Sequence, residues 1–362
     1  MNKFKKIGLT ALAGSLVTMG SATAGEMSVS GSIGVTLGYG TLGGNSSRAI
    51  GSDRDVAFTG SGELDNGTTF SMNTLLDDSY EVSGTTTTIA TPSFGTFYVG
   101  TGYGLQSGRY DEEVPQAYEQ ISDAKQTMAN IVGNFMDNNH IMYTPPAMEF
   151  MGATFQAHLG YTPQASDAVV GDGGQATYNE TWGSGKEAGL TISYDALKLG
   201  FYGAERENVT GGKAATGQQL SDEFNGAWYV KYSMGPVSIG YSETYMDGGV
   251  TQALTSEKTT SSKAERTAGG LFTGEQMSIA FNVNDNMSIS YTTSDETYDT
   301  QDDAKTATTN DDDVTESIDA IQVAYSMGGM SIKAYNMEVS NPDQDDNAAD
   351  QSITEIALGF AF

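Results

Sequence analysis

The chain carries few of the side chains on which catalysis and metal binding usually depend. Cysteine is absent from its 362 residues, which excludes disulfides, thiolate nucleophiles and thiolate metal sites. Only two histidines occur, His140 and His158, so a site built on two imidazoles would have to use both. No neighbouring sequence signals a serine nucleophile that would pair with His158 as its base. The chain is therefore not expected to be an enzyme, and no catalytic residue is predicted.

Carboxylates are the most abundant reactive groups. The chain has 46 Asp and Glu against 17 Lys and Arg, a formal net charge of −29. Binding of nucleic acid through its phosphates needs clustered Lys and Arg, so no nucleic-acid partner is expected. Runs such as Asp311-Asp312-Asp313 offer the oxygen ligands that Ca²⁺ takes in sets of about 6–8. Calcium at such acidic loops is the one cofactor that the sequence admits, and without EF-hand spacing its site is not placed.

One long connection, 102–138, combines charged residues with apolar, helix-compatible stretches at Ala117–Gln126 and Met128–Phe135. A connection of more than about 15 residues in a compact fold is usually functional or disordered. The apolar content indicates that this one packs against another part of the protein. Its charged side chains are therefore candidates for an electrostatic role: Arg109, Asp111, Glu112, Glu113, Glu119, Asp123 and Lys125.

The elements that position these residues are strands. Alternation of apolar and polar residues, the period of a β-strand, runs through almost the whole chain beyond residue 24. In one run, for example, apolar residues occupy every second position at Val35, Leu37 and Tyr39. Another such run near the end has them at Ile356, Leu358 and Phe360. The runs are about 9–12 residues long, which suits a tilted strand that crosses a bilayer.

The first 24 residues have the three regions of a secretory signal peptide. Met1–Lys6 is basic, Ile7–Met19 is apolar, and Ala22-Thr23-Ala24 is a small-residue cleavage site. The apolar run is too short to cross about 30 Å of hydrocarbon as a helix. The sequence therefore predicts a signal peptide at 1–24 and a mature, exported chain at 25–362.

The connections between the strands alternate between short and long, which is the hairpin pattern of an outer-membrane barrel. Sixteen segments are counted from 27–40 to 351–362, and both termini fall on the short-turn side, where the end strands can pair. The predicted fold is all-β, a 16-stranded antiparallel transmembrane β-barrel. The short turns are predicted at Glu63–Gly67, Thr91–Gly95, Pro145–Glu149, Asp195–Ala196, Gly235–Pro236, Asn284–Asn286 and Gly328–Gly329, and the long loops near 41–47, 162–183, 207–221, 247–270, 297–315 and 341–351.

The alternative fold is a secreted β-sandwich, which also alternates. Its outer faces would be polar and its turns of similar length at both ends. Here the apolar parity repeatedly ends in an aromatic residue, as at Tyr161, Tyr241 and Tyr291. Amphipathic rings favour the depth of the lipid headgroups, so this pattern is typical of the aromatic girdle of a membrane barrel.

Several short motifs are distributed over the whole chain: the signal Met1–Ala24, the opening strand Val29-Ser30-Gly31-Ser32-Ile33, the runs Gly60–Gly67 and Ser93–Gly100 at the first two short turns, and the terminal Phe362. With these motifs the chain resembles the 16-stranded general diffusion porins of Gram-negative outer membranes, most of all the alphaproteobacterial type. The resemblance covers the whole chain.

The resemblance implies a homotrimer of barrels in the outer membrane, in contact with its lipid and lipopolysaccharide. It implies that 102–138, the third long connection, folds inward to constrict the pore and sets its acids against bases on the facing wall. It also implies that the C-terminal aromatic strand, with Phe360 and Phe362, is the signal read by the outer-membrane assembly machinery.

Parity separates the charged residues of the strands into two faces. Val56 and Phe58 share the lipid-facing parity of their strand, whereas Asp53 and Asp55 have the other. An Arg or Lys facing lipid at mid-bilayer costs about 2–4 kcal/mol, so charges are expected on the pore side. Arg54 is the exception, because it shares the lipid-facing parity of Val56. We therefore expect Arg54 to lie at the outer rim of the barrel or in a subunit interface. The residues predicted for the pore wall are Asp53, Asp55, His158, Lys198, Arg206, Lys231 and Lys333.

The expected function is passive diffusion of ions and small hydrophilic solutes through a water-filled pore. The chain departs from related porins where these often place arginines early in the wall, because Asp53 and Asp55 stand there. A pore lined by acids enriches cations, which predicts cation selectivity. Two alternatives remain open: a substrate-specific channel, with Tyr98, Tyr103 and Tyr110 as candidate contacts, and a surface adhesin with acidic loops.

Overall fold

The computed structural model describes residues 25–42, 45–77, 79, 81–101, 109–110, 113–122, 140–165, 182–208, 221–248, 271–299, 313–345 and 347–362. The predicted signal peptide, 1–24, and most of the connection 102–138 lie outside these residues. No helix in the described part of the chain is long and apolar enough to cross a membrane.

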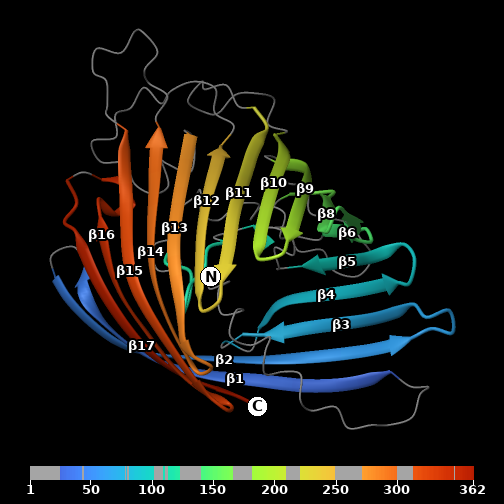
Figure 1. Ribbon diagram of the computed structural model, residues 1–362, viewed down its shortest axis with the longest axis horizontal. Helices are drawn as coiled ribbons and strands as arrows, with labels where there is room; N and C mark the ends of the chain where they lie inside the picture. The colour runs from blue at the N-terminus through green and yellow to red at the C-terminus, as the bar shows by residue number, and fades with distance from the viewer. Residues whose placement is uncertain are drawn as a thin grey trace.

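All of the strands belong to one antiparallel sheet, in which each strand pairs with its neighbours along the chain (Figure 1). β6 and β7 both pair with β8 and together occupy one position, so the sheet is a barrel of 16 strand positions. The strands are β1 (Glu26–Leu42), β2 (Asn45–Glu63), β3 (Thr69–Leu76), β4 (Val82–Thr91), β5 (Gly95–Thr101), β6 (His140–Thr144), β7 (Met148–Phe150), β8 (Ala153–Thr162), β9 (Trp182–Tyr194), β10 (Leu197–Asn208), β11 (Glu223–Met234), β12 (Val237–Asp247), β13 (Leu271–Asn284), β14 (Met287–Asp299), β15 (Val314–Met327), β16 (Met330–Ser340) and β17 (Gln351–Ala361), with the 3₁₀-helix η4 (Pro342–Gln344) before β17.

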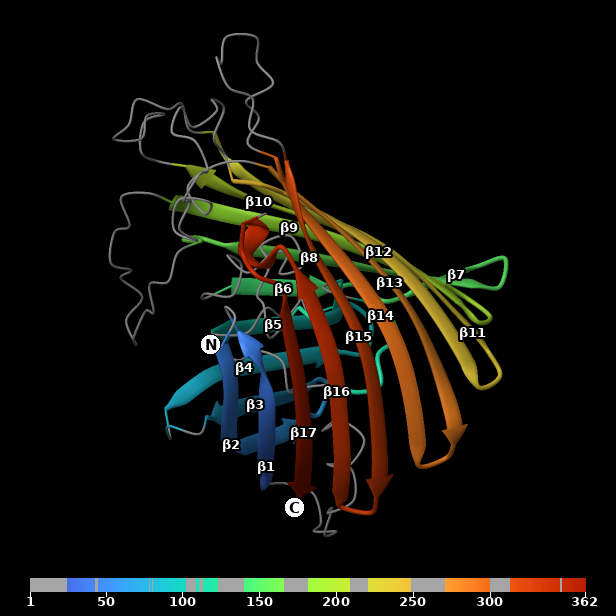
Figure 2. The same ribbon diagram turned by 90° about the vertical axis from the view of Figure 1, so that its left-hand side faces the viewer.

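The first and last strands close the barrel. β1 and β17 lie side by side and pair from Ser32↔Ala361 to Thr41↔Ser352 (Figure 2). Gly31 and Phe362 extend this seam by two further backbone hydrogen bonds, of 2.9 and 3.1 Å. Closure leaves no sheet edge with unpaired N–H and C=O groups, which a strand structure in hydrocarbon requires.

The two faces of the barrel have opposite chemistry. On the outer face apolar side chains are exposed, such as Met277 at 60% and Ile321 at 63%. On the inner face the alternating residues are polar and buried, such as Gln276 at 2% and Gln322 at 1%. A soluble protein has the reverse arrangement, so this pattern fits a barrel whose outer surface contacts lipid. The predicted parity is confirmed, and the single closed sheet excludes the β-sandwich.

Two-residue turns join most of the strands at one end of the barrel. The predicted turns Asp195–Ala196, Gly235–Pro236 and Gly328–Gly329 are confirmed by the flanking pairs, for example Tyr194↔Leu197. Asp195, Gly235 and Gly328 have positive φ angles of 52°, 58° and 59°. Tight hairpin turns of this hand match the right-handed twist of the strands that they connect.

Two predicted connections were wrong. The turn predicted at Pro145–Glu149 lies instead at Met151 and Gly152, with φ of 52° and 82°. Pro145 and Pro146 have no N–H donor, so they interrupt the strand between β6 and β7 and shift its register with β8 by one residue. The long loop predicted near 41–47 is also absent, since β1 and β2 remain paired up to Leu42↔Asn45. Polar strands can continue to pair in water, beyond the membrane.

The seam offers a test of barrel closure. Val35 pairs with Leu358 of β17 and with Ser52 of β2. Val35→Pro removes a backbone donor in the middle of the ladder, and we expect it to lower the folding equilibrium constant at least about tenfold, or about 1.4 kcal/mol. The readout is the gel mobility of unheated against heated protein. Val35→Thr keeps the donor and the branched shape and should fold normally. Equal folding of the Pro variant would show that closure does not depend on this seam.

Candidate functional site

Residues 113–122, within the connection 102–138, are hydrogen-bonded to inner-face side chains. The Ala117 N–H donates to Ser290 Oγ on β14 at 2.9 Å. The Tyr118 N–H donates to Gln322 Oε1 on β15 at 2.8 Å, and Gln322 Nε2 donates to the Glu119 carbonyl at 2.6 Å. Strand side chains thereby satisfy backbone groups of a segment that has no regular secondary structure of its own.

Tyr118 and Ile121 anchor this segment near the seam. The Tyr118 hydroxyl donates to Glu355 Oε1 on β17 at 2.6 Å, and its ring lies 5.8 Å from that of Tyr335 on β16. Burial raises the pKa of the Tyr118 hydroxyl well above its ordinary value of 10, with further increases from Glu119 and Glu355. The hydroxyl therefore remains a donor at any physiological pH. Ile121 is 3% exposed and packs with Ile318, Met337 and Val339.

Tyr110 anchors the preceding part of the connection on the other side of the barrel. Its side chain is fully buried, with its ring centroid 5.1 Å from that of Tyr202 and 6.3 Å from that of Tyr229. Gly189 on β9 makes room for it, because a Cβ at that position would come 2.6 Å from Tyr110 Cε2. The inner wall is thus shaped to receive this ring.

A carboxylate of the same connection neutralises two wall lysines. Lys198 on β10 and Lys231 on β11 stand directly opposite each other in the strand register. Glu113 forms ion pairs with both, at 3.8 Å from Lys198 Nζ and in close contact with Lys231. Two ammonium groups in directly opposite positions repel each other. The carboxylate between them offsets this repulsion, which stabilises the pairing of β10 with β11 and holds Glu113 at the wall.

The other bases predicted for the wall have partners as well. Arg206 donates from Nε to Glu223 Oε2 at 2.8 Å, and its guanidinium lies 3.7 Å from the centre of the Trp182 ring. Lys333 Nζ lies 5.2 Å from the centre of the Tyr118 ring. A cation over an aromatic face is attracted by the electron-rich π system, so Lys333 adds a contact to the anchored segment.

The remaining predicted wall residues lie in two regions. His158 on β8 is 3% exposed and hydrogen-bonded through Nδ1 to the Thr144 hydroxyl at 3.1 Å. Asp53 and Asp55 lie half-buried on the inner face of β2, alternating with the exposed Arg54. These positions agree with the predicted parity.

The predicted residues of the loop and of the assembly signal lie in part outside the described residues. Arg109 is exposed and next to the buried Tyr110. Phe360 and Phe362, the predicted assembly signal, are exposed by 42% and 75% on the outer face near the seam. Outside the described residues lie Asp111, Glu112, Asp123 and Lys125.

Sequence reasoning missed the inner-face acids of the later strands. Glu187 is 5% exposed and accepts a hydrogen bond from the Tyr202 hydroxyl at 2.7 Å. Glu223, Glu296 and Glu316 are buried as well. The sequence pattern could have identified these four acids, because each of them has the parity opposite to that of the outward-facing apolar residues of its strand. Among the described residues no group of three or more histidines and carboxylates could hold a metal ion.

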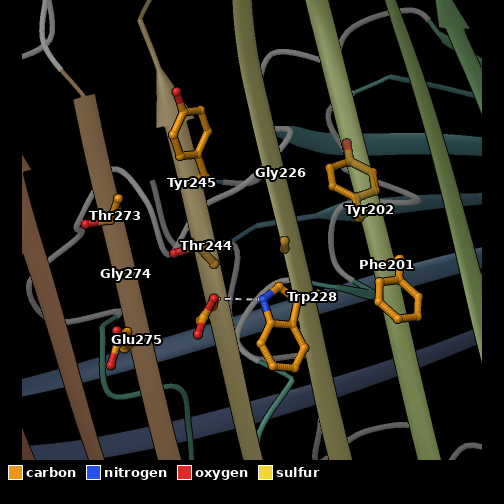
Figure 3. A pocket seen from close by; sticks show the side chains of 11 residues that line it. Phe201, Tyr202, Gly226, Trp228, Thr244, Tyr245, Thr273, Gly274 and Glu275 are labelled. Atoms are coloured by element: carbon orange, nitrogen blue, oxygen red, sulfur yellow. Dashed lines mark hydrogen bonds between the residues drawn. The ribbon is translucent and has the colours of Figure 1, made fainter.

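The outer face has a hollow of its own, of about 560 Å³, between β10 and β13 (Figure 3). Phe201, Trp228 and Tyr245 line it together with the carboxylates of Glu243 and Glu275. Trp228 Nε1 donates to Glu243 Oε2 at 2.9 Å. Because these side chains have the outward parity, the hollow opens on the side opposite to the segment 113–122, outside the barrel.

The model of one protein family, described as Gram-negative porin, matches residues 8–271. The chain belongs to the Gram-negative porin family. As a porin it is a β-barrel diffusion channel of the outer membrane and has no enzymatic activity, which confirms the predicted family, location and non-enzymatic nature. No curated protein has a sequence significantly similar to it.

Solved porin structures share the fold at low identity. OmpF of Salmonella typhi, in complex with daunomycin, has a TM-score of 0.66 at 10% identity over 94% of this chain and 98% of that one. An anion-selective porin from Comamonas acidovorans has 0.63 at 12% over 93% and 100%. OmpT of Vibrio cholerae in a trimer form has 0.58 at 13% over 94% and 100%. These likenesses show the barrel alone; the alphaproteobacterial type of this porin stays a prediction.

The Tyr118–Glu355 hydrogen bond gives a test of how the segment is held. Tyr118→Phe removes a donor to a carboxylate, which costs about 1.5–3 kcal/mol, while the ring contacts remain. We expect the segment to detach more often, seen as more frequent brief changes of the single-channel current. Tyr291→Phe is the matched control, since it loses an equivalent bond, to Asp319 at 2.7 Å, on the outer face. Equal current noise in both variants would show that Tyr118 does not hold the segment in the channel.

Proposed function

We propose that this porin is a cation-preferring pore for passive diffusion of ions and small hydrophilic solutes. In this proposal the connection 102–138 is the third extracellular loop, folds into the barrel and forms its constriction. The single observation that carries the proposal is the attachment of Tyr110 and of residues 113–121 to inner-face side chains of strands as distant as β9 and β17.

The anchors support a segment that follows the inner wall over about half of the circumference of the barrel. Tyr110 and Glu113 contact β9 to β11, the middle of the segment contacts β13 to β15, and Tyr118 contacts β17. β10 and β17 are seven positions apart in a barrel of 16, so they lie on nearly opposite sides. A chain attached at both places narrows the water-filled space between them.

The charges of the inner face support a preference for cations. The wall bases near the segment are largely neutralised, because Glu113 pairs with Lys198 and Lys231, and Glu223 pairs with Arg206. The inner-face acids outnumber these bases, and a surplus of fixed negative charge enriches cations in the pore. Those acids, in the described strands, include Asp53, Asp55, Glu187, Glu223, Glu296, Glu316 and Glu355. The similar porin from Comamonas acidovorans is anion-selective, and this property of that protein is not transferred to the present chain.

Of the three candidate aromatics of the substrate-specific alternative, Tyr98 lies half-buried on the inner face of β5, and the other two give it no support. Tyr110 is fully buried against Tyr202 and Tyr229, so it has no free face on which a passing sugar would stack. Tyr103 lies outside the described residues. The adhesin alternative does not account for a connection whose backbone is hydrogen-bonded to the inner wall.

The proposal includes a homotrimer, as in the trimer form of OmpT from Vibrio cholerae. It also includes outer-membrane lipid and lipopolysaccharide as surroundings, and Phe360 and Phe362 as the signal for the assembly machinery. The exposure of both rings at the end of β17 suits recognition by another protein. Calcium at the acidic loops remains a proposal without an assigned site.

The test is the reversal potential of single channels of the unheated protein in a planar bilayer with a salt gradient. We expect a cation-preferring potential for the wild-type protein. Glu113→Gln leaves Lys198 and Lys231 without their shared carboxylate, and should lower the cation-to-anion permeability ratio about twofold or more. Glu243→Gln removes an outer-face carboxylate and serves as the control, with no change expected. A chloride-preferring wild-type pore, or equal effects of the two variants, would contradict the proposal.

A further inference from the structure

The hollow on the outer face, between β10 and β13, combines aromatic rings with carboxylates (Figure 3). Phe201 of β10 stands opposite Trp228 of β11 in the strand register. In the same row Glu243 of β12 stands opposite Trp228 on one side and opposite Glu275 of β13 on the other. The volume of about 560 Å³ is within the range of about 300–1,000 Å³ of small-ligand sites. The register of four strands thus places two aromatic rings and two carboxylates side by side at one edge of the hollow.

Two glycines on the same face keep the hollow open. Gly203 of β10 and Gly226 of β11 stand opposite each other, and Gly226 also stands opposite Tyr245 of β12. Figure 3 shows Gly226 on the strand that carries Trp228, with Tyr245 on the next strand. Because neither glycine has a side chain, the surface beside the half-buried Trp228 ring stays uncovered at this point.

The carboxylates of the hollow have neutral hydrogen-bond donors and no base beside them in the described strands. Trp228 Nε1 donates to Glu243 Oε2 at 2.9 Å, and the Tyr241 hydroxyl donates to Glu243 Oε1 at 2.6 Å. Every Lys and Arg in the described residues of β10 to β14 has the inward parity. Like charges in directly opposite positions destabilise a strand pair, so a cation from outside the barrel that lies between Glu243 and Glu275 offsets their repulsion.

The hollow lies at the depth of the lipid headgroups. On β13 the outward residues from Glu275 toward the short turn are apolar and exposed, and they end at Val283. The eight residues from Glu275 to Val283 rise about 26 Å along the strand, or about 20 Å along the membrane normal at a tilt of about 40°. This rise covers most of an apolar band of about 25 Å. Glu275 therefore stands at the boundary of that band, on the side of the long connections.

We propose that this hollow binds the ammonium headgroup of a membrane lipid. The ammonium lies against the Trp228 ring, because a cation is attracted by the electron-rich face of an indole, and aromatic sites recognise alkylammonium groups in this way. Glu243 and Glu275 supply the opposite charge. The acyl chains continue over Ile239 and Met277, which are exposed by 49% and 60% on the same face.

Two other ligand classes match the lining less well. Among the described residues no group of three or more histidines and carboxylates could hold a metal ion, and aromatic rings supply none of the oxygens that Ca²⁺ takes. A neutral sugar can stack on Phe201 and Trp228, but it leaves both carboxylates without a counter-charge.

Trp228 itself can report the binding. The chain has two tryptophans, and the other, Trp182, lies 3.7 Å from the Arg206 guanidinium, which belongs to the inner face. Trp182→Phe therefore leaves Trp228 as the only indole emitter. The folded, full-length protein is placed in bilayer discs with a lipid that is brominated on its acyl chains next to the glycerol and quenches indole emission on contact. We expect brominated phosphatidylethanolamine to quench Trp228 with a relative binding constant at least about threefold above that of brominated phosphatidylglycerol.

Two double variants in the Trp182→Phe background separate the hollow from the general charge of the outer face. Glu243→Gln/Glu275→Gln removes both carboxylates of the hollow and keeps their shape, and it should lower the ratio of binding constants to about one. Asp319→Asn/Glu338→Gln is the matched control, because it removes two exposed carboxylates of β15 and β16 outside the hollow, and it should keep the ratio. The gel mobility of unheated protein verifies that each variant is folded.

Three results overturn the inference. The first is an equal quenching by the two brominated lipids in the Trp182→Phe protein. The second is an equal loss of preference in both double variants, which assigns the effect to the charge of the whole outer face. The third is relief of the quenching by lipopolysaccharide without any preference for phosphatidylethanolamine, which assigns a sugar to the hollow. The proposed selectivity of the pore is independent of these results, because the hollow lies outside the barrel.

Discussion

The fold depends on one constraint: in hydrocarbon every backbone N–H and C=O must find its partner within the protein. A sheet meets this condition only when it closes, and here β1 and β17 pair along ten residues to close it. Once it is closed, alternation gives the barrel one apolar and one polar face. The polar inner face then carries the hydroxyls, amides and carboxylates that hold the segment 113–122. The membrane thus requires a closed barrel, and the alternation along its strands places polar side chains in the interior.

The wall and the inner segment depend on each other electrostatically. Lys198 and Lys231 stand opposite each other on adjacent strands, an arrangement that is unfavourable without a counter-charge. Glu113 is that counter-charge, and Glu355 holds Tyr118 on the far side. Because these contacts use charge, the groups that position the segment also set the electric field that a permeating ion experiences. In the proposed pore, the residues that hold the segment are therefore also residues that affect ion selectivity.

The sequence was most informative where one face contacts lipid and the other does not. For β9 to β16 the alternation predicted both the strands and the inward direction of Lys198 and Lys231. It was wrong at 41–47, because polar strands continue to pair outside the membrane, and at Pro145, where a proline pair interrupts a strand without turning the chain. Parity also assigned Arg54 to the outer face of β2, where its side chain is exposed.

The contacts of the inner segment could not be predicted from the sequence. Tyr118 and Glu355 are 237 residues apart, and Glu113 and Lys231 are 118 apart. No local pattern states which acid reaches which wall residue, since this depends on barrel diameter and on gaps such as that at Gly189. Composition showed that the connection is both charged and apolar, and only the fold shows where its described side chains are bound.

The most direct test of the central claim, that this connection lies in the conducting path, is chemical modification during current recording. Arg109→Cys introduces the only thiol of the chain next to the buried Tyr110, at an exposed position. A bulky cationic thiol reagent added to the open channel should reduce its single-channel conductance, whereas the same reagent should not affect Glu275→Cys on the outer face. Complete labelling of Arg109→Cys, verified by mass spectrometry, with an unchanged conductance would contradict the account.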